Sequence, residues 1–172
     1  MAAFTEQQMK EFSMAKYYSL EGQTAVVTGG STGLGLAITR CLISSGAKVV
    51  VLSMESEEQA AEALKEFGDK AVYYQFNITE TDKTQAMADR IVAEQGPVSI
   101  LVNNAGNHCK KFIWEMSVEE YVNVLNVHLV GAFALTKALV PQMLSLIHIF
   151  RTSLYLPRQR ASVERAQQRD RR

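Results

Sequence analysis

The sequence lacks the features of a secreted or membrane-spanning protein. It has two cysteines, no apolar block near the N-terminus, and no uncharged apolar run close to the ~18–20 residues that a membrane span needs. No cysteine pattern indicates a disulfide framework, so reduced thiols are expected. With 47% hydrophobic and 21% charged residues, the composition is that of a folded globular protein. We therefore expect a cytoplasmic protein with one packed domain.

Lysine is absent from residues 151–172, which contain seven arginines and two acidic residues. No heptad repeat or strand alternation continues past Phe150, so this basic tail lacks the pattern of a nucleic-acid-binding arm. The hexapeptide LSLIHI, from Leu144 to Ile149, resembles one reading frame of an adapter used in sequencing libraries. We expect residues 144–172 to be a non-native tail, and we expect neither nucleic acid nor a membrane as a partner.

Upstream of this tail, short apolar runs alternate with amphipathic segments, which is typical of βαβ units and a parallel sheet. The apolar runs are almost continuous in Val, Ile and Leu, as in strands covered on both faces. Strands are predicted at residues 24–28, 48–53, 71–76 and 98–103.

Four helices are predicted between and after these strands, two of them from capping boxes of the form Ser-x-x-Glu or Ser-x-x-Gln. The expected fold class is α/β: the N-terminal part of a Rossmann-type, doubly wound parallel sheet, with about four strands and four helices. Residues 1–19 are expected to be an extension, and residues 20–143 a truncated NAD(P)-binding domain. The helices are placed at 33–45, from Ser56 to Gly68, from about Thr81 to Gln95, and over 117–143.

A glycine-rich turn joins the first strand to the first helix in the stretch TAVVTGGSTGLGLA. Gly29, Gly33 and Gly35 suit a tight turn, a close approach of a pyrophosphate to the backbone, and close packing of the helix on the strand. The helix N-terminus adds free N–H groups and the positive end of its dipole. The pattern follows a predicted strand and opens a predicted helix, which favours a dinucleotide site.

The spacing G-x-x-x-G-x-G, together with Asn-Asn-Ala-Gly at 103–106, resembles the short-chain dehydrogenase/reductase family over about residues 20–143. This resemblance implies a cofactor loop from Thr28 to Gly35. It also implies that Asn77 and Ile78 contact the adenine, with Asn77 replacing the usual acid while still able to donate and accept hydrogen bonds. The cofactor-binding residues implied are Thr28, Gly29, Ser31, Thr32, Gly33, Leu34, Gly35, Ser53, Asn77, Ile78, Asn104, Ala105 and Gly106.

The cofactor is expected to be NAD or NADP, with a slight preference for NAD. In Rossmann folds an acid after the second strand holds the ribose 2′-hydroxyl, whereas arginine holds a 2′-phosphate. Ser53 and Met54 occupy this place, and Thr32 stands where many NADP-dependent members have a basic residue. Glu55 is a possible ribose partner, although it is poorly placed for that role.

The family's catalytic groups are missing from the sequence. The resemblance implies a serine, a general acid/base tyrosine and a lysine four residues after it, all beyond Met143. None of the six tyrosines is followed four positions later by lysine. The chain as written is therefore expected to be truncated and inactive.

His128, in VHLVGAF, occupies the position of the family's fourth catalytic residue, an asparagine that holds a water in a proton relay. An imidazole can pass protons near neutral pH, so His128 is either a relay residue or a histidine bonded to backbone at a helix irregularity. His108 and Cys109 make a poor metal site because neighbouring side chains diverge, and no metal is expected.

Two functions remain open from the sequence. The first is an NAD(P)-dependent oxidoreductase acting on a ketone or secondary alcohol. NHCKKFIWEMSVEEY and FSMAKYYSLEG resemble gluconate 5-dehydrogenase and related sugar-acid dehydrogenases, with 3-oxoacyl carrier-protein reductase as the nearest rival. The second is a non-catalytic dinucleotide-binding module or redox sensor. An arginine-tailed nucleic-acid binder ranks last. The broad apolar stripe of helix 117–143 packs in a subunit interface in the family, so the full-length protein is expected to be a homo-oligomer with a small-molecule substrate.

Overall fold

The computed structural model describes residues 18–150 of the chain. Most of the N-terminal extension and residues 151–172 of the predicted tail lie outside this range. The structure therefore leaves the predictions about them untested.

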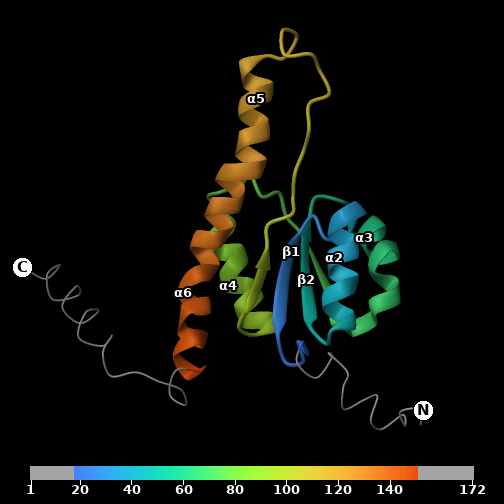
Figure 1. The fold of residues 1–172 in the computed structure, drawn as a ribbon, viewed down its shortest axis with the longest axis vertical. Helices are drawn as coiled ribbons and strands as arrows, with labels where there is room; N and C mark the ends of the chain where they lie inside the picture. Colours follow the sequence, from blue (N-terminus) through green and yellow to red (C-terminus); the bar gives the residue numbers. More distant parts are fainter. Residues whose placement is uncertain (1–17, 151–172) are drawn as a thin grey trace, which may run out of the picture.

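A parallel sheet of four strands forms the centre of the described part (Figure 1). Its strands are β1 (Thr24–Thr28), β2 (Lys48–Ser53), β3 (Ala71–Gln75) and β4 (Ile100–Val102), in the order β3-β2-β1-β4. All three pairings are parallel, and Val26 of β1 is paired with Val50 of β2 and Leu101 of β4. Successive strands are added on one side of β1 as far as β3, and β4 is then added on the other side of β1. This leaves a crevice at the carboxyl ends of β1 and β4, where open α/β sheets bind ligands.

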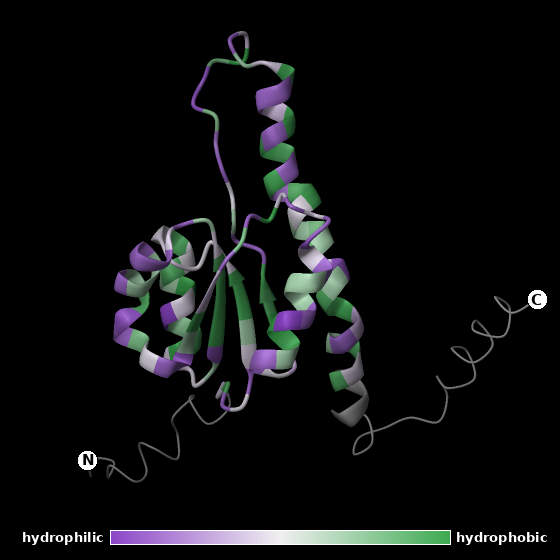
Figure 2. Cartoon of the chain, turned by 180° about the vertical axis from the view of Figure 1, so that it is seen from behind, coloured by the Kyte–Doolittle hydropathy of each residue, from purple (hydrophilic) through white to green (hydrophobic). Residues whose placement is uncertain are grey.

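Helices cover both faces of the sheet, as the apolar strands predict. On one face lie α2 (Gly33–Ser44), α3 (Glu57–Leu64) and the 3₁₀ segment η2 (Lys65–Lys70). On the other lie α4 (Thr84–Gln95) and α6 (Ala132–Phe150) (Figure 1). Alternate side chains of β1 point to opposite faces: Val26 packs with Ile91 and Leu135, whereas Val27 packs with Ile43. Two apolar cores result, and Figure 2 shows the strands mainly in the colour of hydrophobic residues.

The segment from residue 103 to helix α5 (Val118–Leu125) extends away from the sheet (Figure 1). A π-helical segment, η3 (Asn126–Gly131), joins α5 to α6, so the predicted helix 117–143 is irregular at its middle. It also continues to Phe150, beyond the predicted end. The outer face of this helical rod carries exposed apolar side chains, namely Val118, Tyr121, Val122, Leu129, Val130 and Phe133.

Both predicted capping boxes are present: Ser56 with Gln59, and Ser117 with Glu120. The fourth strand is shorter than predicted, spanning Ile100–Val102 and not 98–103. Residue 98 is not part of it because the side chain of Gln142 occupies both backbone groups of Val98. The Val98 N–H donates to Gln142 Oε1 (3.1 Å) and its carbonyl accepts from Gln142 Nε2 (2.9 Å). Helix α4 begins later than predicted because residues 81–83 form tight turns, with Thr84 N–H donating to the Thr81 carbonyl.

One helix, Val118–Leu146, is long and apolar enough to cross a membrane by length and composition. It contains no long uncharged apolar run, because polar and charged residues are scattered along it. Leu135 and Leu139 of the same helix are fully buried in the core shared with α4. Part of its apolar surface is therefore used in packing the domain, as in the core helices of globular proteins.

Candidate functional site

The β1–α2 turn forms one wall of a cleft at the carboxyl edge of the sheet. Gly33 has a φ of +52°, a conformation that glycine adopts without strain. A Cβ on Gly35 would overlap the carbonyl oxygen of Gly29, so the turn can close only with glycine here. Thr32, at the N-cap of α2, makes no side-chain capping bond. The first N–H groups of α2 are therefore free of a side-chain cap and can receive an anion such as a phosphate.

Asn104 and Thr28 tie this turn to the loop after β4. The Asn104 side-chain Nδ2 donates to the carbonyl oxygens of Thr28 (3.0 Å) and Gly29 (3.2 Å). In return, Thr28 Oγ1 accepts from the backbone N–H groups of Asn104 (3.0 Å) and Ala105 (2.9 Å). Both sides of the crevice are thus held at a fixed separation before any ligand binds.

Glu55 lies just past β2, and its carboxylate accepts hydrogen bonds from several hydroxyl groups. Its carboxylate accepts from Ser31 Oγ (2.9 Å), from Thr32 Oγ1 (3.5 Å) and from Ser53 Oγ. Partial burial opposes ionisation, but the bonds from Ser53, from its own backbone N–H, from Ser31 and from Thr32 outweigh it. They hold the pKa of Glu55 below its ordinary value. The side chain is therefore a carboxylate at neutral pH.

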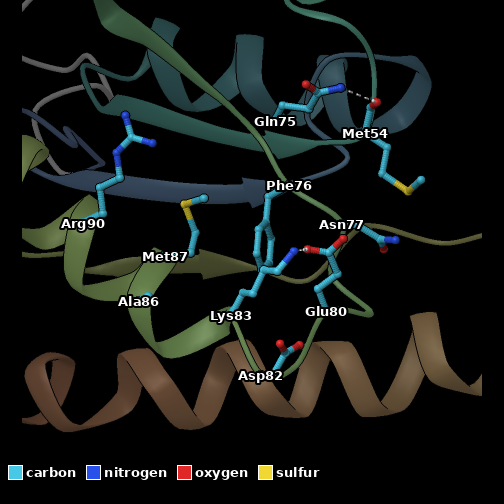
Figure 3. A pocket seen from close by; sticks show the side chains of 10 residues that line it. All are labelled: Met54, Gln75, Phe76, Asn77, Glu80, Asp82, Lys83, Ala86, Met87 and Arg90. Atoms are coloured by element: carbon cyan, nitrogen blue, oxygen red, sulfur yellow. Dashed lines mark hydrogen bonds and ion pairs between the residues drawn. The ribbon is translucent and has the colours of Figure 1, made fainter.

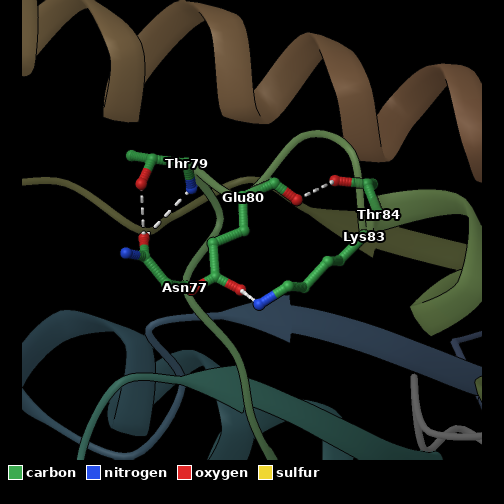
Figure 4. A network of polar contacts seen from close by, with 5 residues as sticks. All are labelled: Asn77, Thr79, Glu80, Lys83 and Thr84. Carbon is green, nitrogen blue, oxygen red and sulfur yellow. Dashed lines mark hydrogen bonds and ion pairs between the residues drawn. The ribbon is translucent and has the colours of Figure 1, made fainter.

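The loop after β3 contains Asn77 in a turn of its own (Figure 4). Asn77 Oδ1 accepts from the backbone N–H of Thr79 (3.1 Å) and from Thr79 Oγ1 (2.8 Å). The Glu80 N–H donates to the Asn77 carbonyl (3.0 Å), and Glu80 pairs with Lys83 at 2.8 Å. This loop is closely fixed at the edge of the cleft.

His128 lies in the π segment η3, which turns its ring onto the loop after β4. His128 Nε2 lies 2.8 Å from the carbonyl oxygen of Asn107. A Cβ on Gly106 would come within 2.6 Å of the ring, so only glycine allows this contact. A backbone carbonyl only accepts, so His128 Nε2 carries the proton in this contact. His128 is therefore bonded to backbone at a helix irregularity, the second of the two alternatives given by the sequence. Its role in a proton relay stays a prediction.

The β1–α2 turn and the loops after β2, β3 and β4 enclose a cleft of about 710 Å³. Glu55 is the one charged residue among those lining it within residues 18–150. The cleft gathers most of the predicted cofactor residues, namely Thr28, Gly29, Thr32, Gly33, Leu34, Gly35, Ser53, Asn77, Ile78, Asn104, Ala105 and Gly106.

Two predicted residues lie outside the lining. Ser31 is buried behind the cleft and supports Glu55, and His128 contacts the cleft through Asn107. Sequence reasoning missed Asn107, Thr79, Asn123 and Val127, which also line it. The Asn-x-Thr pattern at 77–79 is a turn signal that could have identified Thr79. Asn123 and Val127 come from α5 and η3, and no local pattern marks them.

A second cavity of about 760 Å³ lies between β3 and α4 and shares Met54, Phe76 and Asn77 with the cleft (Figure 3). Its cations are already paired: Lys83 with Glu80, and Arg90 with Glu94 at 2.8 Å. Arg90 also lies over the ring of Tyr74 at 4.8 Å. The cavity therefore offers no unpaired cation for an anionic ligand among the residues that line it.

A family model described as short chain dehydrogenase matches residues 23–148. The chain is 37% identical over 129 residues to a 2-dehydro-3-deoxy-D-gluconate 5-dehydrogenase of Formosa agariphila, covering 73% of this chain and 49% of the relative. It is 34% identical over 131 residues to a 3-oxoacyl-acyl-carrier-protein reductase of Escherichia coli, covering 76% and 53%. A solved short-chain dehydrogenase from Novosphingobium aromaticivorans matches with a TM-score of 0.69 and 30% identity, over 76% of this chain and 49% of that one. The chain thus spans about half the length of these relatives.

Proposed function

Because this chain belongs to the short-chain dehydrogenase family, we propose that its sheet and surrounding loops bind a nicotinamide dinucleotide in the cleft at the carboxyl edge of the sheet. One observation carries this proposal: the N-terminus of α2 lacks a side-chain cap and opens onto a turn that a Cβ at Gly35 would block. Such a turn brings backbone N–H groups close to a phosphate.

Different residues of the cleft contact different parts of the dinucleotide. The first turn of α2 holds the pyrophosphate, Ser53 and Glu55 face the ribose of the adenosine half, and Asn77 with Ile78 lies at the base. Asn104, Ala105 and Gly106 lie beside the nicotinamide half. When bound, the cofactor supplies hydride transfer, and the residues of this chain bind and orient it.

The charge of the cleft favours NAD over NADP. Glu55 is a carboxylate held by three hydroxyls, and no lysine or arginine is among the residues that line the cleft. A 2′-phosphate placed near it would meet a like charge, and like charges close together cost free energy.

Binding measurements test this preference. We expect calorimetric titration to give at least tenfold tighter binding of NAD than of NADP, and Glu55→Lys to reverse the order. Glu62→Lys is the matched control, since it makes the same charge change on exposed α3 away from the cleft. Equal binding of the two dinucleotides by the unmodified chain would refute the preference.

The activity that we propose for the full-length protein is oxidoreduction of a ketone or secondary alcohol. The Formosa relative supports a sugar acid as the substrate, and the Escherichia coli relative supports the rival, a 3-oxoacyl group. We propose that the 172-residue chain has no turnover, because its sequence contains no Tyr-x-x-x-Lys pair. General acid/base catalysis typically contributes ~10²–10⁴-fold. Oxidation of sugar acids or reduction of keto esters above the level of a Gly33→Asp control would contradict this.

A second candidate is a non-catalytic dinucleotide-binding module or redox sensor, which the missing Tyr-x-x-x-Lys pair favours. Reading the genomic locus past codon 143 separates the two. An in-frame serine and Tyr-x-x-x-Lys support the enzyme, whereas a stop codon supports the module.

For the full-length protein we propose a homo-oligomer located in the cytoplasm. The support for the oligomer is the exposed apolar face of α5, η3 and the start of α6, since an apolar patch of this kind is typical of interfaces. Sedimentation of the full-length protein with Phe133→Glu tests this, because a charge on that face should shift the oligomer toward monomer.

A further inference from the structure

The short turn between β2 and α3, which carries Glu55, is held by two side chains of strand β3. Tyr73 and Gln75 are two positions apart, so their side chains point to the same face of the sheet. The Tyr73 hydroxyl lies 2.5 Å from the Glu55 carbonyl oxygen and 3.1 Å from the Ser53 carbonyl oxygen. Gln75 Nε2 donates to the Met54 carbonyl at 3.3 Å (Figure 3). Three successive carbonyl oxygens of the turn are therefore bound by one neighbouring strand.

The contact from Tyr73 to Glu55 is the shortest of the three. A carbonyl oxygen only accepts, so the phenol donates, and its single proton goes mainly to the closer oxygen. Burial, followed by the charges of Glu55 and Glu57, raises the pKa of the Tyr73 phenol, which is therefore a protonated donor at neutral pH. The ring packs against the apolar core that contains Leu64. Tyr73→Phe would remove the hydroxyl and keep this packing.

The carboxylate of Glu55 is only partly used by other side chains. Its Oε2 accepts from Ser31 Oγ at 2.9 Å and from Ser53 Oγ. Its Oε1 accepts from Thr32 Oγ1 at 3.5 Å, and no other side chain within residues 18–150 donates to it. Glu55 and Thr32 both line the cleft. A carboxylate oxygen can accept two hydrogen bonds, so Oε1 has capacity left for a hydroxyl group of a ligand.

The position of this oxygen depends on the turn that carries it. A hydrogen bond from a hydroxyl to a carboxylate spans about 2.5–2.7 Å, so a small displacement of the turn weakens it. Only Met54 and Glu55 lie between the end of β2 and Ser56, the N-cap of α3. The Ser56 side chain is used in its own capping box. The support for the Glu55 backbone therefore comes from β3, and chiefly from Tyr73.

We infer that Tyr73 is a positioning residue for cofactor choice. By binding the Glu55 carbonyl, it holds the Glu55 carboxylate where it accepts the ribose 2′-hydroxyl of NAD and opposes the 2′-phosphate of NADP. The inference rests on the proposed function, since it takes the ribose to lie beside Glu55. Tyr73 is not among the residues that line the cleft, so its effect on binding passes through the turn.

Calorimetric titration of NAD and NADP into Tyr73→Phe tests this. We expect NAD to bind at least fivefold more weakly than it binds the unmodified chain. NADP should bind equally well or more tightly, because a displaced carboxylate repels its phosphate less. Tyr74→Phe is the matched control, since the Tyr74 hydroxyl donates to Glu94 at 2.6 Å on the opposite face of the sheet. This control should leave the ratio of the two dissociation constants unchanged, as would a purely structural role of Tyr73.

A second pair of variants tests the route through Glu55. In Glu55→Ala the carboxylate is gone, so adding Tyr73→Phe should change the affinity for NAD by less than twofold. An unchanged ratio in Tyr73→Phe, with circular dichroism showing an intact fold, would overturn the inference and leave the proposed function standing. A fivefold loss in the Glu55→Ala background would do the same. Failure of the unmodified chain to bind either dinucleotide would overturn the proposed function and the inference together.

Discussion

His128 Nε2 and the carbonyl oxygen of Asn107 lie 2.8 Å apart, joining the π segment of the long helix to the loop after β4. The contact crosses from one face of the domain to the edge of the cleft. It places Asn107 and Gly106 where the proposed nicotinamide half of the cofactor binds. π segments within α-helices are frequent at functional sites, and here the interruption positions one side chain.

Replacing this histidine tests the contact. His128→Ala should lower the free energy of unfolding by about 1 kcal/mol, because it removes a hydrogen bond and leaves the Asn107 carbonyl without its donor. His128→Asn keeps a short donor and should lose less. Urea denaturation of the three proteins measures this, and a His128→Ala variant as stable as the unmodified chain would show that the hydrogen bond contributes nothing.

Gly106 and His128 should be energetically coupled. Gly106→Ala places a methyl group 2.6 Å from the imidazole ring and should destabilise the fold by about 1–3 kcal/mol through overpacking. In Gly106→Ala/His128→Ala the obstructing ring is gone, so the loss should be smaller than the sum of the two single losses. Additive losses in a double-mutant cycle would mean that the ring and the loop do not restrain each other.

Asn104→Ala should loosen both sides of the cleft. It leaves the carbonyl groups of Thr28 and Gly29 without their side-chain donor, at a cost of about 1–3 kcal/mol in stability. Dinucleotide binding should weaken as well. Asn103→Ala is the matched control, because Asn103 is exposed and its side chain, among residues 18–150, bonds only the Thr136 hydroxyl (3.0 Å). Thermal melts and titrations of both variants decide whether the loss is specific to position 104.

Glu55 should make stability depend on pH in the acidic range. The pKa of its carboxyl is lowered in the folded chain, so the folded state favours the ionised form. The resulting stabilisation is present above the unfolded pKa, about 4.3, and is lost as pH falls through the lower folded pKa. We expect Glu55→Gln to flatten the pH dependence of the melting temperature below about pH 5. A parallel curve for the variant would show that Glu55 does not contribute.

Local sequence determined the elements of this domain and the family to which it belongs. The runs TAVVT and KVVVLS specify strands covered on both faces, and the β-strands at 24–28 and 48–53 have the predicted bounds. The capping boxes at Ser56 and Ser117 formed as predicted, because their hydrogen bonds join residues only three positions apart. The close approach of Gly35 to the Gly29 carbonyl is equally local, because the two residues are six positions apart, whereas the bonds from Asn104 that hold the turn come from a distant loop.

Tertiary structure decided which residues far apart in the sequence contact one another. Gln142 takes both backbone groups of Val98, a residue that the sequence placed in β4. The turn after β2 brings Glu55 to the hydroxyls of Ser31 and Thr32. These contacts of Glu55 could not be predicted from the local sequence, because the two hydroxyls come from the β1–α2 turn, more than twenty residues away. The π segment turns His128 onto Gly106 and Asn107, which the 3.6-residue stripe of the helix did not predict. Periodicity reports which face of an element is buried, whereas these contacts depend on how separate elements pack, which only the assembled fold determines.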